Sequence, residues 1–165
     1  EHHFVLTKND FAVPRARLVA GIEIEPDDAR AIERLRDPAF PMAMRAILAD
    51  GKPRDDGIGD VGTARIVSTD PDHLVIDVDV KREAYLVLAD TDFPGWRARV
   101  DGHERRIERA NVAFRAVALR RGDKRVEFAY EPKSVLYGGL GSALSALVWL
   151  GLCFGAGRRW LTLEA

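Results

Sequence analysis

The sequence predicts a mainly β protein, an antiparallel β-sandwich with one short N-terminal helix, followed by a C-terminal transmembrane helix. Three observations carry this prediction. Between residues 62 and 130, short segments alternate apolar and polar residues between regularly spaced turns, which is typical of a sandwich. One segment near the start has helical spacing instead, and residues 134–157 contain no charged side chain. We therefore expect a β-sandwich domain over 1–132, a transmembrane helix over 133–159 and a short tail over 160–165.

Composition limits the classes of function. A chain of 165 residues suits one domain with an appendage. The chain has 25 basic and 26 acidic side chains, so its net charge is close to zero. It therefore has no overall positive field that would attract nucleic acid, and no nucleic-acid partner is expected. The single cysteine, Cys153, excludes a disulfide within the chain and any metal site built from several cysteines.

The first elements are a strand and a short helix. Residues 16–24, ARLVAGIEI, predict one strand. The stretch EPDD, residues 25–28, is a good helix start, with a proline in the first turn and acids at the positive end of the helix dipole. Asp37-Pro38 ends this helix, and its apolar face is expected to hold Ala29, Ile32 and Leu35. Residues 42–48, MAMRAIL, fit a helix or a strand, and residues 51–60 are a loop.

From Gly62 onward, apolar and polar residues alternate with a period of two. The segments TARIVS and HLVIDVDV flank a turn at residues 69–72, and the second points its apolar residues one way and its acids the other. The segment YLVLA, residues 85–89, is apolar on both faces and predicts a central strand.

Four further strands follow. WRARV, residues 96–100, alternates one apolar face with two arginines, and Asp101-Gly102 predicts a tight hairpin into ERRIE. VAFRAVAL, residues 112–119, is expected to pair with KRVEFAY, residues 124–130, across a turn at 121–123.

The uncharged run of 24 residues would rise about 36 Å as a helix, enough for a hydrocarbon core of about 30 Å. A buried core helix is the alternative, but such helices seldom run so far without a charge. Arg158-Arg159 favour a cytoplasmic C-terminus, which makes the preceding domain extracytoplasmic. Small residues recur at every fourth position, which lets helices approach closely in lipid and predicts packing against other helices: Gly138, Ser142 and Ala146.

Two pairs of aspartates are candidates for metal or ligand contact. Asp77 and Asp79 resemble the cation-binding pair of nucleotide-sugar transferases. However, they lie mid-strand on a polar face, so a self-contained enzyme of that kind is the weakest hypothesis. Asp90 and Asp92 end a strand, where turn hydrogen bonding explains them first and ligand contact second.

The break after Asp92 reads DFPGW. Pro94 and Gly95 supply a bend, and Trp96 begins an apolar face. Trp96 is therefore interpreted first as a residue that fills the sandwich core, and only second as an exposed ring on which a sugar stacks. His73 and His103 lie apart beside turns, and no nucleophile or acid/base set is assembled. We expect no metal, no cofactor and no catalytic residue in this chain.

Residues 84–134, AYLVLADTDFPGWRARVDGHERRIERANVAFRAVALRRGDKRVEFAYEPKS, precede the apolar run. The ordered pattern L-V-L-x-D, P-G-W-x-A-x-V-D-G, A-N-x-A-F-R-A-V and V-x-F-x-Y-x-P-x-S resembles the C-terminal region of YfhO-type bacterial membrane proteins. This resemblance implies a polytopic protein with many upstream helices, similar to the GT-C glycosyltransferases that use polyprenyl-phosphate sugars. The catalytic acids of such enzymes lie in an early extracytoplasmic loop, which this chain does not contain.

Residues of the domain that match the family motif are Trp96, Asp101, Gly102, Asn111, Phe114 and Arg115, whereas Asp92-Phe93 replace tyrosines that are common in the family. The ligand-binding candidates are Asp90, Asp92, Asn111 and Arg115. The structural motif comprises Pro94, Gly95, Trp96, Asp101, Gly102 and Phe114. The expected partners are membrane lipid, the upstream helices of the parent protein and a cell-envelope glycan.

Two functions follow. The first is the accessory extracytoplasmic domain and last membrane helix of a membrane glycosyltransferase acting on cell-envelope polymers. The second is a noncatalytic, membrane-tethered module that binds glycan or has a structural role. The small residues of the helix favour the first, because a simple tether does not need them.

Overall fold

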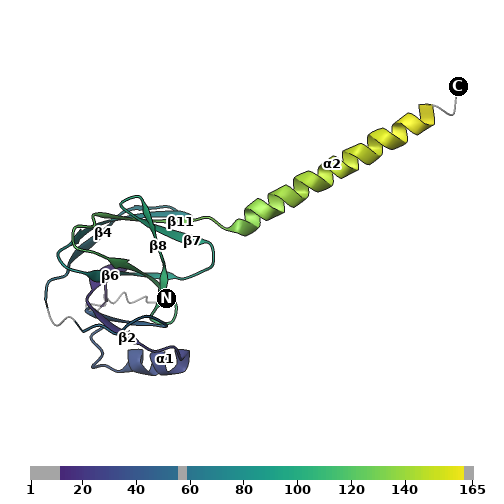
Figure 1. The fold of residues 1–165 in the computed structure, drawn as a ribbon. Helices are drawn as coiled ribbons and strands as arrows, with labels where there is room; N and C mark the ends of the chain where they lie inside the picture. The colour runs from purple at the N-terminus through teal and green to yellow at the C-terminus, as the bar shows by residue number, and fades with distance from the viewer. Residues whose placement is uncertain (1–11, 56–58, 162–165) are drawn as a thin grey trace, which may run out of the picture. The chain divides into compact units, whose positions relative to one another are not determined.

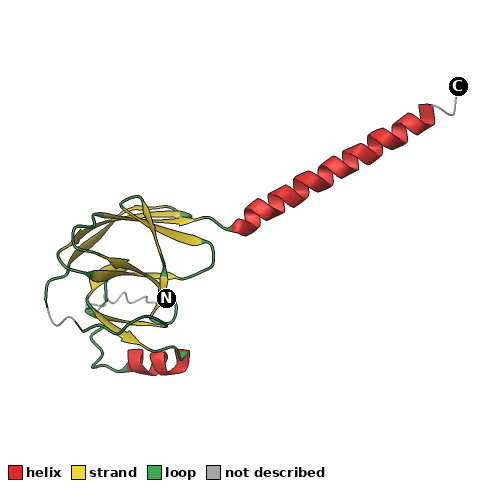
Figure 2. Cartoon of the chain, viewed as in Figure 1, coloured by secondary structure: helices red, strands yellow, loops and turns green. Residues whose placement is uncertain are grey.

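The computed structural model describes residues 12–55 and 59–161, and the chain divides into two units, Glu1–Tyr130 and Glu131–Ala165. The first unit contains strands β1 to β11 and helix α1 (Asp28–Arg36), and the second contains helix α2 (Lys133–Leu161) (Figure 1). Strands dominate the first unit, as Figure 2 shows, which confirms the predicted mainly β class.

The strands form two sheets. Sheet 1 has the spatial order β1 (Ala16–Val19), β6 (Ala84–Thr91), β10 (Phe114–Leu119), β9 (Glu108–Ala110), β3 (Arg45–Leu48) and β2 (Gly21–Ile24). Sheet 2 has the order β4 (Gly62–Thr69), β5 (His73–Val80), β11 (Arg125–Tyr130), β7 (Trp96–Val100) and β8 (His103–Arg105). Neighbouring strands are antiparallel except β2 and β3, which are parallel and are joined through α1. The antiparallel sandwich with one short helix is confirmed.

Sheet 1 curls until its edges meet. β1 and β2 are its two outermost strands, yet Ala20 alone links them. Two residues of chain span at most about 7 Å, so the end of β1 and the start of β2 lie close together. Each of the six strands also contributes to one buried apolar cluster: Val19, Ile22, Ala46, Leu48, Val87, Ala110 and Ala116. Sheet 1 is therefore a nearly closed barrel with its own core.

A second core lies between the sheets. The outward face of β1, β6 and β10 packs against the inner face of sheet 2, where Ile76, Val126 and Phe128 are fully buried. Strand β6 serves both cores, because Leu86 and Leu88 face the sandwich while Val87 faces the barrel. The prediction of a central strand at 85–89 is confirmed.

Several predicted connections are wrong. Residues 16–24 form two strands, because the chain turns the corner of the barrel at Ala20. Strands β10 and β11 belong to different sheets and do not pair with each other. The segment ERRIE is likewise divided between β8 in sheet 2 and β9 in sheet 1. Alternation marks the face that a residue presents to a core, but a short link can cross between sheets as easily as it closes a hairpin.

Helix α1 begins within the predicted stretch, but Pro26 precedes the N-cap instead of lying in the first turn, and a partly different face is buried. The side chain of the N-cap residue Asp27 accepts a hydrogen bond from the amide of Arg30 at 3.0 Å. Ala31 is buried and packs near Phe40 and Ile47, whereas Ile32 is 38% exposed. Of the expected apolar face, Leu35 is partly buried against this cluster, whereas Ala29 and Ile32 are exposed, so the expected face is right only in part.

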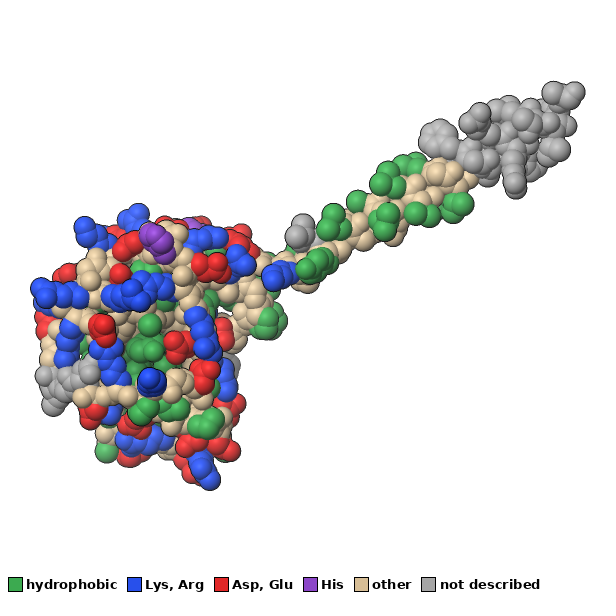
Figure 3. Space-filling view, in the orientation of Figure 1, with side chains coloured by type: hydrophobic (Ala, Val, Ile, Leu, Met, Phe, Trp, Pro, Cys, Tyr) green, Lys and Arg blue, Asp and Glu red, His purple; other side chains and the backbone are tan. Residues whose placement is uncertain are grey.

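Helix α2 has the length and composition of a membrane span. The 20 residues of Lys133–Leu152 have a mean hydropathy of 1.6. Large apolar side chains along its described part are uncovered, with Leu144 65% and Trp149 66% exposed (Figure 3). In water such a surface is costly, whereas in a bilayer it faces hydrocarbon.

Candidate functional site

The DFPGW break is a corner of the sandwich, as predicted. The chain leaves β6 in sheet 1 and enters β7 in sheet 2 across this break. Gly95 has φ 114°, a conformation that residues with a Cβ rarely adopt. The amide of Asp92 donates to the carbonyl oxygen of Ala113 at 2.7 Å, which ties the corner to the turn before β10.

A pocket of about 640 Å³ opens at this corner. Its walls come from both sheets and from distant parts of the chain. They include Arg15 before β1, Asp70 in the β4–β5 turn, Asp90 in β6, Trp96 at the start of β7 and Arg115 in β10. The volume lies within the range of about 300–1,000 Å³ that is usual for small-molecule sites.

Asp90 holds two arginines in this pocket. Its carboxylate accepts a forked pair of hydrogen bonds from Nε and Nη2 of Arg15, at 2.7 and 2.8 Å. It also accepts one from Nη2 of Arg115 at 3.2 Å. The side chain of Arg15 is 47% exposed, whereas that of Arg115 is 4% exposed. The hydrogen bond that Arg15 donates to Asp90 raises the pKa of Arg15, while burial lowers the pKa of Arg115.

The guanidinium of Arg115 is stacked between aromatic rings. Its central carbon lies 4.0 Å from the ring centroid of Trp96 and 5.3 Å from that of Phe128. Within the described part of the chain, its Nε and Nη1 atoms have no hydrogen-bond partner. Asp90 and the negative faces of the two rings therefore balance a buried positive charge.

Trp96 is both a core residue and a pocket wall. It is partly buried against the sandwich core, together with the buried Ala98 and Val100 of its strand. Its ring lies 5.3 Å from that of Tyr130, tilted by 48°. The core interpretation agrees with this packing, and the pocket adds an accessible part of the ring.

The other ligand candidates lie elsewhere. Asn111 is buried in the β9–β10 turn, where its Oδ1 accepts from the amide of Ile47 at 2.9 Å. Asn111 and Asp92 are not among the described residues that line the pocket. The structure thus brings together Asp90 and Arg115 of the four candidates. It adds Arg15, which the sequence did not indicate because its partner is 75 residues away.

The remaining motif residues shape turns and strands. Asp101 and Gly102, with φ 49° and 82°, form the predicted tight turn between β7 and β8. The carboxylate of Asp101 also accepts hydrogen bonds from the amides of Lys124 and Arg125, which fixes the start of β11. Phe114 is partly buried and packs against the barrel core.

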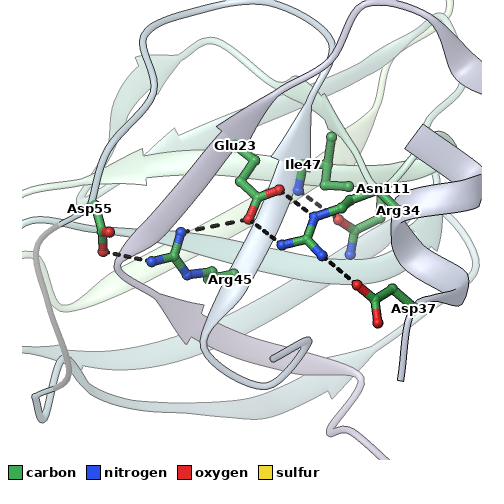
Figure 4. A network of polar contacts seen from close by, with 7 residues as sticks. All are labelled: Glu23, Arg34, Asp37, Arg45, Ile47, Asp55 and Asn111. Carbon is green, nitrogen blue, oxygen red and sulfur yellow. Dashed lines mark hydrogen bonds and ion pairs between the residues drawn. The ribbon is translucent and has the colours of Figure 1, made fainter. Parts of the chain in front are cut away.

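Two further polar groups have structural roles. Asp77 forms an ion pair with Arg125 at 2.9 Å on the surface of sheet 2, as expected for a solvated strand face. In a second network, Arg34 of α1 bonds Glu23 of β2 and Asp37, and Arg45 of β3 reaches Glu23 and Asp55 (Figure 4). This network ties α1 to the strands that precede and follow it. Among the described residues, no group of three or more His, Cys, Asp or Glu side chains could hold a metal ion.

Part of the chain is similar to a known protein family. Residues 62–142 match the family model described as bacterial membrane protein YfhO. The matched range runs from β4 into α2 and contains Asp90, Trp96 and Arg115, whereas Arg15 lies outside it. No curated protein and no solved structure matches the chain.

Proposed function

The chain carries the YfhO region of bacterial membrane proteins over residues 62–142, and from this premise we propose that it is part of a membrane glycosyltransferase. In this proposal, the β domain is an accessory extracytoplasmic domain, and α2 is the last membrane helix of a polytopic protein. The parent protein transfers sugars from polyprenyl phosphate to cell-envelope polymers.

The uncovered apolar surface of α2 is the observation that supports this proposal most. The large apolar side chains along its described part are exposed, and its small residues recur on one face: Gly138, Ser142 and Ala146. A single tether gains little from such a face, whereas a bundle of membrane helices packs through it.

The β domain fits an accessory role. Three of its acids, Asp77, Asp90 and Asp101, are engaged in ion pairs or in hydrogen bonds to backbone amides. The catalytic acids would come from other parts of the parent protein, and this domain would position the acceptor polymer or brace the membrane helices.

Cysteine labelling tests the sidedness of the domain. In a Cys153→Ser background, the chain is given a single cysteine either by Glu104→Cys on the exposed end of β8 or by Leu163→Cys in the tail. A membrane-impermeant maleimide applied to intact cells should label the first variant and not the second. The reverse pattern would place the β domain in the cytoplasm and contradict the proposal.

The noncatalytic module remains the second candidate. The pocket at the sandwich corner favours it, because binding alone needs no catalytic set. Deletion of the gene separates the two functions. Loss of a sugar substituent from an envelope polymer supports the transferase, whereas unchanged sugar composition with altered polymer attachment supports the module.

A further inference from the structure

The charges that line the corner pocket cancel. Arg15 and Arg115 contribute two positive charges, and Asp70 and Asp90 contribute two negative ones. A phosphate or carboxylate ligand needs positive charge that the protein has not already neutralised, and both arginines already bond Asp90. The balance favours an uncharged polar ligand.

The polar groups are arranged for hydroxyl groups. An arginine has five N–H donors, and Asp90 takes two of those on Arg15, so the rest remain on a guanidinium that is 47% exposed. A carboxylate has about four acceptor positions, and three hydrogen bonds to Asp90 leave about one. A sugar hydroxyl both donates and accepts, so it can use both groups.

Trp96 supplies an apolar wall that is already ordered. The stacked guanidinium of Arg115 and the ring of Tyr130 hold the indole in place. One side of a sugar ring presents C–H groups, which pack against an aromatic ring. Because the indole and the Arg15 fork are fixed beforehand, little side-chain entropy is lost on binding.

We propose that this pocket binds an uncharged sugar unit, with Trp96 as the apolar part of its wall and Arg15 and Asp90 bonded to its hydroxyls. The proposal deepens the proposed function, because it rests on that function for the source of the sugar, an envelope glycan. It commits to a neutral saccharide, and an anionic polymer is the competing outcome of the test.

Intrinsic fluorescence measures binding in the full chain. The chain is placed in lipid nanodiscs with Trp149→Phe and Trp160→Phe, so that Trp96 is the one remaining tryptophan. Uncharged tetrasaccharides of glucose, N-acetylglucosamine, galactose or mannose are titrated in parallel with poly(glycerol phosphate). We expect at least one tetrasaccharide to change the Trp96 emission saturably, while poly(glycerol phosphate) has no such effect.

Variants assign the binding to the pocket. Arg15→Ala leaves the Asp90–Arg115 pair in place and should weaken tetrasaccharide binding at least about tenfold. Arg65→Ala is the matched control, an exposed arginine paired with Asp77 outside the pocket, and should leave binding unchanged. Thermal unfolding of both variants verifies that they fold.

Three outcomes would overturn the proposal: no response to any tetrasaccharide, a saturable response to poly(glycerol phosphate) alone, or sugar binding that Arg15→Ala leaves intact. None of them alters the cysteine-labelling result, so a failure of this inference is distinguishable from a failure of the proposed function.

Discussion

At the first residue of β4, the backbone requires glycine for two reasons. Gly62 has φ 111°, and a Cβ added there would collide with the carbonyl oxygen of Asp79 on β5. Gly102 also has a positive φ, 82°, but a Cβ there would meet nothing within 4 Å. A side chain at Gly62 would meet backbone atoms, so strand β4 or β5 would have to move to make room for it. A side chain at Gly102 would meet open space, so the cost there is only the strain of the positive φ.

We therefore expect Gly62→Ala to lower the free energy of unfolding by at least about 3 kcal/mol. Gly102→Ala should lower it by about 1 kcal/mol. Urea unfolding of the two variants checks this difference. Equal losses would show that strain alone, rather than the contact with β5, makes glycine necessary at Gly62.

Asp90 balances the charge of a side chain that is almost completely buried. Asp90→Asn removes the negative charge beside Arg115, which is 4% exposed, and should lower the free energy of unfolding by about 2 kcal/mol. Asp77→Asn also removes a carboxylate bonded to an arginine, but on the surface, and should cost much less. Urea unfolding decides, and similar losses in the two variants would mean that Arg115 does not depend on Asp90.

Glu108 gives the domain a dependence on pH. Burial raises the pKa of its carboxyl group, and the positive charge of Arg106 opposes this only in part. The folded state therefore holds the proton more tightly than the unfolded state, in which glutamate titrates near about 4.3. The stability from this group is present below that pH and is lost as the pH rises through the raised pKa.

The pH dependence can be measured by urea unfolding from pH 4 to pH 7. Glu108→Gln should remove part of the fall in stability over this range, so that the variant gains relative to the parent as the pH rises. Glu33→Gln, on the exposed surface of α1, is the control and should leave the slope unchanged. A parallel slope for Glu108→Gln would contradict the expectation.

At the scale of elements, the β9–β10 turn depends on one side chain. Asn111 has φ 48° and Val112 has φ 72°, which is costly for a β-branched residue. The bond from the amide of Ile47 to Asn111 compensates by fastening the turn to β3. Asn111→Ala and Asn111→Gly both leave that buried amide unpaired, which costs about 1–3 kcal/mol.

Comparison of these two variants separates the hydrogen bond from the backbone strain. Glycine adopts the positive φ freely, so Asn111→Gly should be less destabilising than Asn111→Ala by about 1 kcal/mol in chemical unfolding. If Asn111→Gly were as stable as the parent, the hydrogen bond to Ile47 would have no net value.

Local elements could be predicted from the sequence, and long-range pairing could not. The β4–β5 and β7–β8 hairpins followed from alternation and from Asp101-Gly102, because a hairpin partner lies next along the chain. Strands β1 and β2 were merged, since segments buried on both faces show no alternation that marks a corner. Likewise, Trp96 and Asp90 could be identified, but Arg15 could not, because only the fold brings it to the pocket.

At the scale of the whole chain, the two units should separate. A fragment that ends at Pro132 retains both apolar cores and lacks the uncovered surface of α2. We expect this fragment to remain in the aqueous phase of a detergent partition, with a β-type circular dichroism spectrum, while the full chain enters the detergent phase. An aggregated fragment beside a full chain that is soluble without detergent would mean that α2 completes the core.

The closure of the barrel also determines the order in which the chain can fold. β1 lies near the start of the chain, but Ala16 pairs with Leu88, and β3 reaches β9 through Leu48 and Ala110. Both pairings close long loops, which slows folding to about milliseconds or seconds. During synthesis, β2 can pair with β3 early, whereas β1 must wait for β6, and β3 must wait for β9. The barrel can therefore close only after β10 has emerged, shortly before α2 itself is made.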